Sequence, residues 1–494
     1  MRPSKIKSPA PALVWLRRDL RLLDNPVLAA AAASGMAVIP VFIDDEPQLG
    51  GAARWWRGRS LAALGNALDA IGSKLTLRRG DALDHLMSLV DETGAREIHF
   101  NRRFEPAGLA DDARIMTDLR GRGIEVHEHD GNRLHQPWSL KTLKGDPFRV
   151  FTPFWRRLAE SYRAPPRHDR PGNLTAPMRW PGSDHIAAFH VKAPWSVGMA
   201  NHWQPGEAGA LALMDKVHEK LPEYGANRDR PDRSGTSRLS PHLAWGEISV
   251  HEIWRRLATD GAPLQNGFLR ELGWRDFNTH LLYHFPRLPT QNWNAQFDSF
   301  PFETSTDKLT AWQRGLTGFP IVDAGMRELW QTGWMHNRVR MIVASFLIKD
   351  LLTDWRTGQA WFWDTLVDAD LAQNAGNWQW VAGSGADAAP YFRVFNPTTQ
   401  SIKFDPDGAY IRKWIPELAS LPTRFIHAPA SAPLDVLVNA EVALGRDYPL
   451  PIVDHAAARL RALALYKSVT RGGGEPDIDE SQPASPRRQR ELFS

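Results

Sequence analysis

The chain of 494 residues contains no cysteine, which excludes disulfide bonds, thiolate zinc centres and iron–sulfur clusters. No apolar run approaches the roughly 18 residues of a membrane-spanning helix, and the basic start MRPSKIKSPAPA lacks the apolar core of a signal peptide. Neither sign of charge dominates, since 60 Lys and Arg stand against 56 Asp and Glu, so composition alone does not identify a nucleic-acid binder. We expect a soluble, cytoplasmic, monomeric protein without a metal site.

A glycine-rich dinucleotide fingerprint is also missing. Between residues 12 and 134, the short apolar runs ALVWL, MAVIPVFID, KLTLRRG, REIHF and IEVHEH alternate with amphipathic helical segments. This alternation predicts βαβ units and a doubly wound parallel sheet, that is, a Rossmann-like α/β domain. Because no G-x-G-x-x-G follows the first predicted strand, this domain need not hold the main cofactor.

The pattern changes once along the rest of the chain. Residues 135–210 are rich in Pro, Gly, Arg and Trp, and their aromatics predict an ordered connecting segment rather than a solvated linker. Helical periodicities then follow almost without strand signals, so residues 211–466 are expected to form an all-α domain. The last residues, 467–494, are low in aromatics and rich in Gly, Pro, Ser and charge, which predicts a disordered tail.

Tryptophan is abundant, with 21 residues, and it is concentrated among polar groups between Thr332 and Trp380. Buried carboxylates and guanidinium groups cost several kcal/mol each unless a partner or ligand compensates them. For any one of these polar residues, a role in core packing is about as good an explanation as a role in ligand binding. Core packing does not explain why so many of them occur together. The sequence therefore indicates a site for a planar ligand, formed by Asn337, Arg338, Arg340, Asp368, Asp370 and Asn374 among indoles.

Several motifs carry a family resemblance. They are LVWLRRDLRLLDNP at Leu13, GTSRLS at Gly235, ELGWRDF at Glu271, TGFPIVDAGMREL at Thr317, TGWMHNRVRM with DADLAQNAGNWQW, and AAPYFRVFNPTTQ at Ala388. In this order and spacing the chain resembles the cryptochrome/photolyase family, flavoproteins that repair ultraviolet-damaged DNA or sense blue light. The resemblance extends from Leu13 to about Tyr466. It implies that the helical domain binds FAD and that the α/β domain carries at most an accessory antenna.

The resemblance also implies the flavin contacts. Thr and Ser hydroxyls at a helix N-terminus can bind phosphate, although GTSRLS taken alone is more often an ordinary cap. Around Met335 a helix is expected to place Asn337, Arg340 and Met341 on one face, with Arg338 about 100° away towards solvent or phosphate. Arg340 is expected to pair with Asp368. The implied cofactor-binding residues are Tyr224, Thr236, Ser237, Arg238, Leu239, Ser240, Phe268, Arg340, Asp368, Ala369, Asp370 and Asn374.

The implied reaction is light-driven repair of a flipped-out cyclobutane pyrimidine dimer, by electron transfer from excited reduced FAD. Glu271 and Trp274 lie i, i+3 on one helix face, the first to hydrogen-bond a pyrimidine carbonyl and the second to stack. Asn337 and Met341 complete the pocket and replace the two histidines of (6-4) enzymes. Asn374 stands opposite flavin N5, where repair enzymes carry Asn and plant cryptochromes Asp. The alternative is a blue-light receptor that signals through the flavin redox state.

Electron supply departs from the family pattern. Trp378 and Trp355 match the first two members of the family's tryptophan chain, but the third position is Phe302, which is harder to oxidise. Photoreduction is therefore expected to be slow, or rerouted through one of the indoles Trp361, Trp363 and Trp380. The expected DNA contacts are Arg228, Arg275, Arg338, Trp380 and Arg393.

The antenna is less clearly marked. RWWRGRSLAAL resembles the class III branch, whose antenna is a folate, but Ala107 and Gly108 replace the acidic and amide ligands expected after FNRRFEP. Methenyltetrahydrofolate is the predicted antenna, with deazaflavin or an empty pocket as alternatives.

Overall fold

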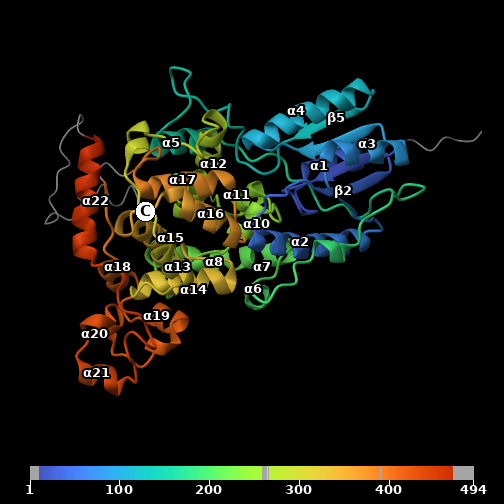
Figure 1. Cartoon of the computed structure of the whole chain (residues 1–494). Helices are drawn as coiled ribbons and strands as arrows, with labels where there is room; N and C mark the ends of the chain where they lie inside the picture. The colour runs from blue at the N-terminus through green and yellow to red at the C-terminus, as the bar shows by residue number, and fades with distance from the viewer. Residues whose placement is uncertain (1–9, 259–263, 265, 389–391, 471–494) are drawn as a thin grey trace, which may run out of the picture.

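Five parallel strands form the sheet of the N-terminal domain, in the order β3-β2-β1-β4-β5 (Figure 1). The computed structural model describes residues 10–258, 264, 266–388 and 392–470. Every side chain of β1 is buried, which explains its unbroken apolar sequence. The strands are β1 Ala12–Leu16, β2 Val38–Asp44, β3 Thr76–Arg79, β4 Glu97–Asn101 and β5 Glu125–His129. Each corresponds to one predicted apolar run, so the expected doubly wound sheet is confirmed.

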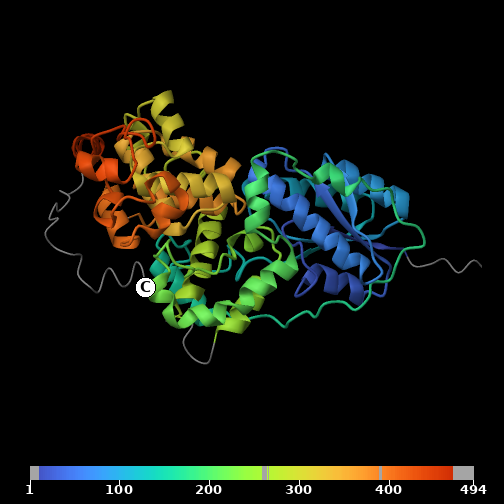
Figure 2. The same cartoon turned by 90° about the horizontal axis from the view of Figure 1, so that it is seen from below.

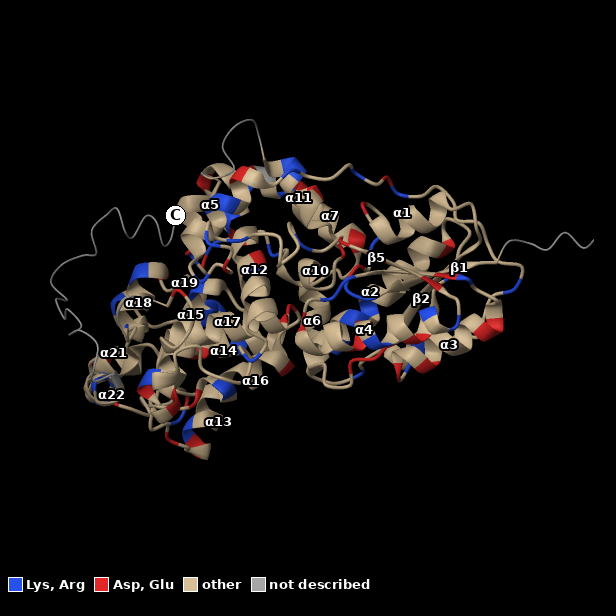
Figure 3. Ribbon diagram, turned by 90° about the horizontal axis from the view of Figure 1, so that it is seen from above, with Lys and Arg blue, Asp and Glu red and all other residues tan. Residues whose placement is uncertain are grey.

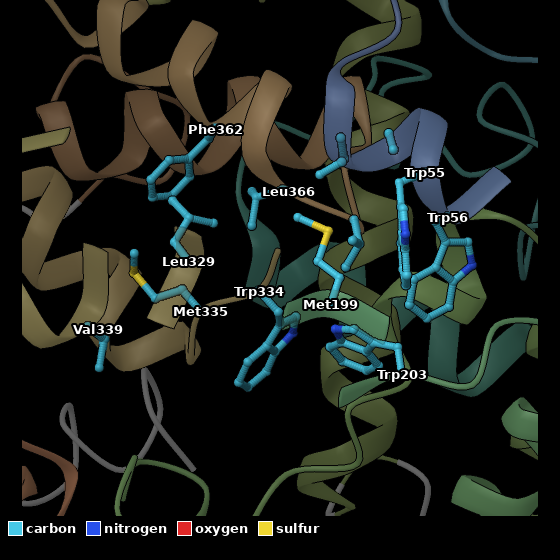
Figure 4. Packing of buried hydrophobic residues seen from close by; sticks show 14 of the residues in the cluster. Trp55, Trp56, Met199, Trp203, Leu329, Trp334, Met335, Val339, Phe362 and Leu366 are labelled. Carbon is cyan, nitrogen blue, oxygen red and sulfur yellow. The ribbon is translucent and has the colours of Figure 1, made fainter. Parts of the chain in front are cut away.

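Four helices connect these strands: α1 Pro26–Ala33, α2 Gly51–Asp69, α3 Ala82–Thr93 and α4 Pro106–Gly121. Local sequence sets their ends. The Asp81 side chain accepts a hydrogen bond from the backbone of Asp84 at the start of α3, and Gly94 ends that helix with a φ of 69°. Helix α2 has buried indoles at Trp55 and Trp56, which turn towards the second domain (Figure 4).

The connecting segment, residues 135–210, contains short helices. They are α5 Phe151–Ser161, η1 Ile186–Phe189 and α6 Ser196–His202. The first helix of the next domain begins at Glu207, slightly before the predicted boundary at 211. Helix α5 packs against α12, so part of the connector belongs to the surroundings of the predicted site.

Helices make up the second domain. Within the described residues beyond His129, one isolated bridge between Leu444 and Tyr448 is the only β-pairing. The elements are α7 Glu207–Asp215, α8 Val217–Lys220, η2 Leu221–Glu223, α9 Tyr224–Asn227, α10 Ser240–Ala244, α11 Val250–Leu257, α12 Gly267–His284, η4 Ala295–Ser299, α13 Thr306–Arg314, α14 Pro320–Thr332, α15 Asn337–Ser345, the π-helix η5 Phe346–Asp350, α16 Trp355–Thr365, α17 Leu371–Ala382, α18 Pro397–Phe404, α19 Ala409–Trp414, η6 Pro416–Leu418, α20 Thr423–Ile426, η7 Pro429–Ser431, α21 Leu434–Asn439 and α22 His455–Thr470.

Helix α22 runs past residue 467, where the sequence predicts a disordered tail. The remainder of that tail, residues 471–494, lies outside the described residues, as do residues 389–391 of the AAPYFRVFNPTTQ motif. None of the helices in the described ranges is long and apolar enough to cross a bilayer.

One apolar core extends across both domains. Figure 2 shows the α/β domain beside the C-terminal helices, with the middle of the chain between them. At their contact, the Trp56 ring lies 5.3 Å from the Trp203 ring, which in turn lies 6.4 Å from that of Trp334 (Figure 4). The same buried cluster includes β1 residues and residues of α14, α15 and α17. This packing holds the helical domain in a fixed position against the sheet domain.

Candidate functional site

Four helical segments bring the predicted site residues together. Tyr224 begins α9, Glu271 lies on α12, Arg340 lies on α15 and Asn374 lies on α17. Helix α17 packs against both α12 and α15, and α12 also contacts α9. Residues distant in the sequence therefore meet around one region of the helical domain.

Tyr224 and Phe268 form one wall of a narrow hollow in which the described side chains leave no room for a water molecule. Their ring centroids are 5.5 Å apart. The other lining residues are Val217, Lys220, Leu221, Gly235 and Ser237. The Lys220 ammonium donates to the carbonyl of Thr236 at 2.8 Å, so a positive charge lies beside aromatic walls. Aromatic faces next to a cation suit a nucleotide base and its phosphate.

Arg238, in the GTSRLS loop, has a strained backbone. Its φ of 58° is in the left-handed region, which is uncommon for a side chain of this size. Its guanidinium lies 4.4 Å from the Trp203 ring and 4.8 Å from the Trp334 ring. Burial lowers the pKa of Arg238, and its Nε is buried without a hydrogen-bond partner among the described residues. Strain and an unsatisfied donor at one residue fit the predicted role in binding a polar cofactor group.

Leu239 and Ser240 follow this arginine. Leu239 is buried, and its backbone N–H donates to the Ser237 hydroxyl at 3.3 Å. Ser240 begins α10, and its hydroxyl accepts a hydrogen bond from the Trp334 indole at 3.2 Å. The loop therefore has the hydroxyl-rich helix start that the sequence predicts.

Arg340 and Asp368 form the predicted ion pair. Nη2 of Arg340 lies 2.8 Å from Oδ2 of Asp368, and Nε of the same guanidinium donates to the Met335 carbonyl at 2.7 Å. The second carboxylate oxygen, Oδ1, is buried and has no partner within the part of the chain that the structure describes. An orphaned buried oxygen is costly, so this atom marks a position where a ligand donor fits.

Asn374 and Asp370 differ in the number of protein partners that their side chains contact. Asn374 is buried and donates its amide to the Gln359 carbonyl at 2.9 Å. Asp370 caps α17 by accepting from the Gln373 backbone, and its other oxygen lies 3.2 Å from Arg133. Burial alone would raise the pKa of Asp370, but the nearby arginines lower it. This carboxylate therefore joins the domains, and the adjoining Ala369 is buried.

Glu271 and Trp274 lie one turn apart on α12, as predicted. Oε1 of Glu271 accepts a hydrogen bond from Nη1 of Arg228 at 2.7 Å. The Trp274 ring stacks on Phe151 of α5, with centroids 3.7 Å apart and planes 10° from parallel. Both side chains are half-buried. Arg228, a predicted DNA contact, is the partner of the Glu271 carboxylate. A carboxylate beside a supported indole can bind a flat ligand with N–H groups.

Two predicted DNA contacts are held by other parts of the protein, Arg338 at a buried position and Arg275 at a half-buried one. Arg338 was expected to reach solvent, but its Nη2 lies 2.7 Å from Asp229 and its guanidinium lies 4.5 Å from the Phe404 ring. Helix periodicity could not show this, because both partners come from distant segments that cover α15. By contrast Asn337 is exposed and Met341 half-buried, so that face of α15 is open.

Arg275 is half-buried and bound to the backbone of other segments. It donates to the carbonyls of Asn132 and Leu243 at 2.7 and 3.1 Å, where α12 faces the first domain. Burial and the adjacent Arg133 lower the pKa of Arg275 to about 9. Both guanidinium groups are therefore engaged by partners within the protein. Trp380 and Arg393 remain half-buried, with the Trp380 indole donating to the Asp387 carbonyl at 3.0 Å.

Trp312 and Trp330, which the sequence analysis did not single out, lie next to tryptophans of the predicted electron route. Trp378 and Trp355 are both buried, and the Trp312 ring lies 6.4 Å from that of Trp378. Phe302 packs against Phe300 at 4.8 Å. Among the predicted detours, Trp361 stacks at 6.0 Å on Trp330, whose side chain is 50 % exposed.

Other polar partners also escaped the sequence analysis. Arg133 donates to Thr279 and pairs with Asp370, Asp229 pairs with Arg338, and Gln359 fixes Asn374. Single polar residues in loops carry no periodic signal, so only the fold reveals these contacts. A cluster of exposed arginines around α5, with Arg149, Arg156 and Arg157, was visible in the sequence as FRVFTPFWRR but was not assigned a role.

Comparison with known proteins agrees with this arrangement. The profile for the FAD binding domain of DNA photolyase matches residues 268–468, and the DNA photolyase profile matches residues 12–172. The deoxyribodipyrimidine photo-lyase of Agrobacterium fabrum is 50% identical over 472 residues, covering 93% of this chain and 98% of that protein. Cryptochrome-2 of Arabidopsis thaliana is 40% identical over 482 residues, and the alignment covers 92% of this chain and 79% of that protein.

Structural similarity is equally extensive. The crystal structure of a bacterial class III photolyase from Agrobacterium tumefaciens superposes with a TM-score of 0.90 at 50% identity, covering 94% of this chain and 99% of that one. Both domains are thus shared over nearly the full length of the two chains. The chain belongs to the cryptochrome/photolyase family.

Proposed function

We propose that this protein repairs cyclobutane pyrimidine dimers in ultraviolet-damaged DNA under light. The observation that carries the proposal is the arrangement on α12, where Glu271 and Trp274 present a carboxylate and an indole on a half-buried surface. The name and 50% identity of the Agrobacterium fabrum relative support the same activity. The repair reading is also favoured by an amide, Asn374, at the position where plant cryptochromes carry a carboxylate.

FAD fits the residues of the site. The aromatic wall of Tyr224 and Phe268 suits the adenine end, and Arg238 with the hydroxyls of the GTSRLS loop suits the phosphates. Asp368 has a buried oxygen that a cofactor N–H or hydroxyl can satisfy. When bound and reduced, the cofactor supplies an electron to the dimer after absorbing light.

Asn374 prepares the polar environment of the flavin ring. Because its amide nitrogen donates to Gln359, the side chain is fixed with its carbonyl oxygen as the acceptor towards a ligand. A fixed neutral acceptor favours a cofactor N–H without adding negative charge to the site. Arg340, neutralised by Asp368, holds the opposite part of the site.

Glu271 and Trp274 position the dimer. An ionised carboxylate only accepts hydrogen bonds, so Glu271 binds an imide N–H of the pyrimidine rather than the carbonyl that the sequence analysis assigned to it. Arg228, held at 2.7 Å, supplies N–H donors for that carbonyl. Trp274, supported on one face by Phe151, offers a stacking surface, and Met341 with Asn337 completes the pocket from α15.

The basic surface around α5 binds the DNA strand next to the flipped dimer. Arg149, Arg156 and Arg157 are exposed there, and Figure 3 shows basic residues along the ribbon of this helix. Helix α5 also provides Phe151, which stacks on Trp274, so the arginines lie on the same element as the support of the pocket. With Arg393 they replace Arg275 and Arg338 as the proposed phosphate contacts.

Trp378 would pass electrons to the flavin. Near the surface the route would differ from the usual one, because Phe302 stands at the third tryptophan position. Trp361 is the proposed detour, because it is the candidate that stacks on a half-exposed indole, Trp330. The antenna is proposed to be methenyltetrahydrofolate, with deazaflavin or no antenna as the alternatives. Extraction of the pigment by denaturation and its absorption spectrum distinguish these three.

Illumination of the reduced, FAD-loaded protein with a dimer-containing oligonucleotide tests the function. We expect intact thymines to be restored in light and not in darkness. The second candidate, a blue-light receptor, is favoured by the 40% identity with Cryptochrome-2. A protein that photoreduces its flavin, binds the oligonucleotide no better than undamaged DNA and restores no thymine would support the receptor.

A further inference from the structure

Three histidines and two glutamates gather on one face of strands β4 and β5, in the α/β domain. Glu97 and His99 lie on β4, and Glu125, His127 and His129 lie on β5, which is an edge strand (Figure 1). The parallel register pairs Glu97 with Glu125 and His99 with His127. Because alternate strand residues point to the same face, all five side chains face one side of the sheet.

Ligand atoms within this cluster are spaced as in a metal site. Nε2 of His99 lies 3.3 Å from Oε2 of Glu97, and Nε2 of His127 lies 3.8 Å from the same oxygen. Nε2 of His127 is also 3.7 Å from Oε2 of Glu125. Bonds of about 2.0–2.1 Å in a tetrahedral zinc site separate neighbouring ligand atoms by roughly 3.3–3.4 Å. Movements of a few tenths of an ångström at the half-exposed His127 therefore close the site.

His127 supplies an independent indication. Its Nε2 is shielded from solvent and has no hydrogen-bond partner among the described residues, although it lies between two carboxylates. A cation placed between the His127 nitrogen and the carboxylate oxygens of Glu97 and Glu125 would bind all three atoms. The side chain is 40 % exposed, so it has room to turn its lone pair towards the ion.

His99 has the second contact typical of a metal ligand. Its Nδ1 lies 3.2 Å from Nε2 of His129, while its Nε2 faces Glu97. Metal-binding histidines generally donate their other ring N–H to an acceptor that fixes the orientation of the ring, and here the ring nitrogen of His129 can serve as that acceptor. His129 is therefore a positioning residue for His99.

Without an ion, the same side chains form a stacked pair of imidazoles. The His99 and His127 rings are 4.5 Å apart and 20° from parallel. Such stacking explains the rings, but it leaves the His127 nitrogen unsatisfied beside the carboxylates of Glu97 and Glu125. A divalent cation compensates this nitrogen and both carboxylates.

We propose that Glu97, His99 and His127 bind one divalent transition-metal ion, zinc foremost, with Glu125 or water as the fourth ligand. Imidazole and carboxylate are ligands that zinc accepts, and the absence of cysteine leaves them as the donors available. The ion would fasten the edge strand β5 to β4. The sequence analysis predicted no metal site, because these ligands come from two strands and match no common spacing motif.

Zinc titration of the chelator-stripped, FAD-loaded protein tests the proposal. We expect one equivalent of zinc to bind tightly and to raise the melting temperature. His127→Gln, at a half-exposed position, should weaken zinc binding by about ten-fold or more and remove the thermal shift. His190→Gln, at an exposed histidine outside the cluster, is the matched control and should leave both unchanged.

X-ray absorption of the zinc-loaded protein provides a second measurement. It should show nitrogen and oxygen neighbours that include two imidazoles in the parent protein, and fewer imidazoles in His127→Gln. Absence of a stoichiometric site, or equal zinc affinity in His127→Gln and the parent protein, would overturn the proposal. The visible spectrum of His127→Gln reports whether FAD is retained. Because the cluster and the flavin site lie in different domains, this variant should keep its FAD.

Discussion

The guanidinium of Arg340 lies 2.8 Å from one oxygen of Asp368, while the other oxygen of the same carboxylate is buried and unpaired within the described residues. One side of the carboxylate is thus fixed by the protein, and the other is available to a ligand. The pair keeps a negative charge inside the helical domain at a defined position without leaving it isolated.

Asp368→Asn tests this pair through cofactor retention. The substitution keeps the shape of the side chain but removes its charge, so Arg340 loses its counter-ion and the ligand loses a strong acceptor. Hydrogen bonds to charged groups contribute about 1.5–3 kcal/mol, so FAD affinity should fall by roughly ten-fold or more. Equilibrium titration of the apoprotein with FAD measures the change. Asp435→Asn, at an exposed carboxylate on α21, should bind FAD like the parent protein.

Substitutions at the edge of the pocket should separate substrate binding from flavin binding. Glu271→Ala removes the acceptor for a pyrimidine N–H and leaves Arg228 without its partner, so affinity for the dimer should fall by about ten-fold. FAD content should stay unchanged, because Glu271 belongs to the pocket and not to the cofactor contacts. Fluorescence titration with a dimer-containing oligonucleotide measures this, and equal affinity in Glu271→Ala would remove Glu271 from the pocket.

The electron route is tested by tryptophan substitutions. Trp330→Phe and Trp361→Phe should each slow light-driven reduction of FAD several-fold, because phenylalanine is harder to oxidise than tryptophan. Phe302→Trp should accelerate it by restoring the usual third position. Bleaching of oxidised flavin under blue light with an external reductant reports the rate. Trp180→Phe, in the connecting segment where it packs against the core of the α/β domain, serves as the control. Unchanged rates in both detour variants would reject this route.

DNA binding should depend on the arginines of α5. Replacing Arg156 and Arg157 together by Gln should weaken binding to damaged and undamaged strands alike, and should lower the slope of log affinity against log salt by about two. Arg424→Gln, on α20 at the opposite end of the helical domain, is the comparison variant (Figure 1). A parent-like salt slope in the double variant would show that the strand runs elsewhere.

Acid should destabilise the fold through buried histidines, of which His336 at the start of α15 is the one closest to the site. Burial lowers the pKa of His336 from 6.5 to about 4. The unfolded chain binds a proton at the ordinary pKa and the folded chain does not, so stability falls as the pH drops from 6.5 towards 4. At about pH 5 this single group removes ~2 kcal/mol relative to neutral pH.

Denaturant unfolding at several pH values measures this loss. His336→Asn keeps a side chain that can cap α15, so it should fold and show a shallower loss of stability in acid. A parent-like pH dependence in His336→Asn would contradict the assignment to His336.

The sequence predicted those parts of the fold and site that depend on local pattern. Strand β1 is buried on both faces, and its unbroken apolar sequence predicted this position in the parallel sheet. The pairing of Arg340 with Asp368 was implied by the family resemblance.

Contacts between distant segments were not predictable in this way. Helix periodicity placed Arg338 towards solvent, but Asp229 and Phe404, far away in the sequence, enclose it. The approach of Trp312 to Trp378, and that of Arg133 to Asp370, likewise depend on how helices pack. Single side chains in loops leave no periodic trace, so these contacts appear only in the folded chain.

The most direct test of the central claim is repair by the purified, FAD-loaded and reduced protein. A dimer-containing oligonucleotide is illuminated with the parent protein and with Glu271→Ala, and recovery of thymine absorbance is followed beside a dark control. We predict light-dependent restoration of thymines that is strongly reduced in Glu271→Ala. Full flavin occupancy without any restoration in light would contradict the account.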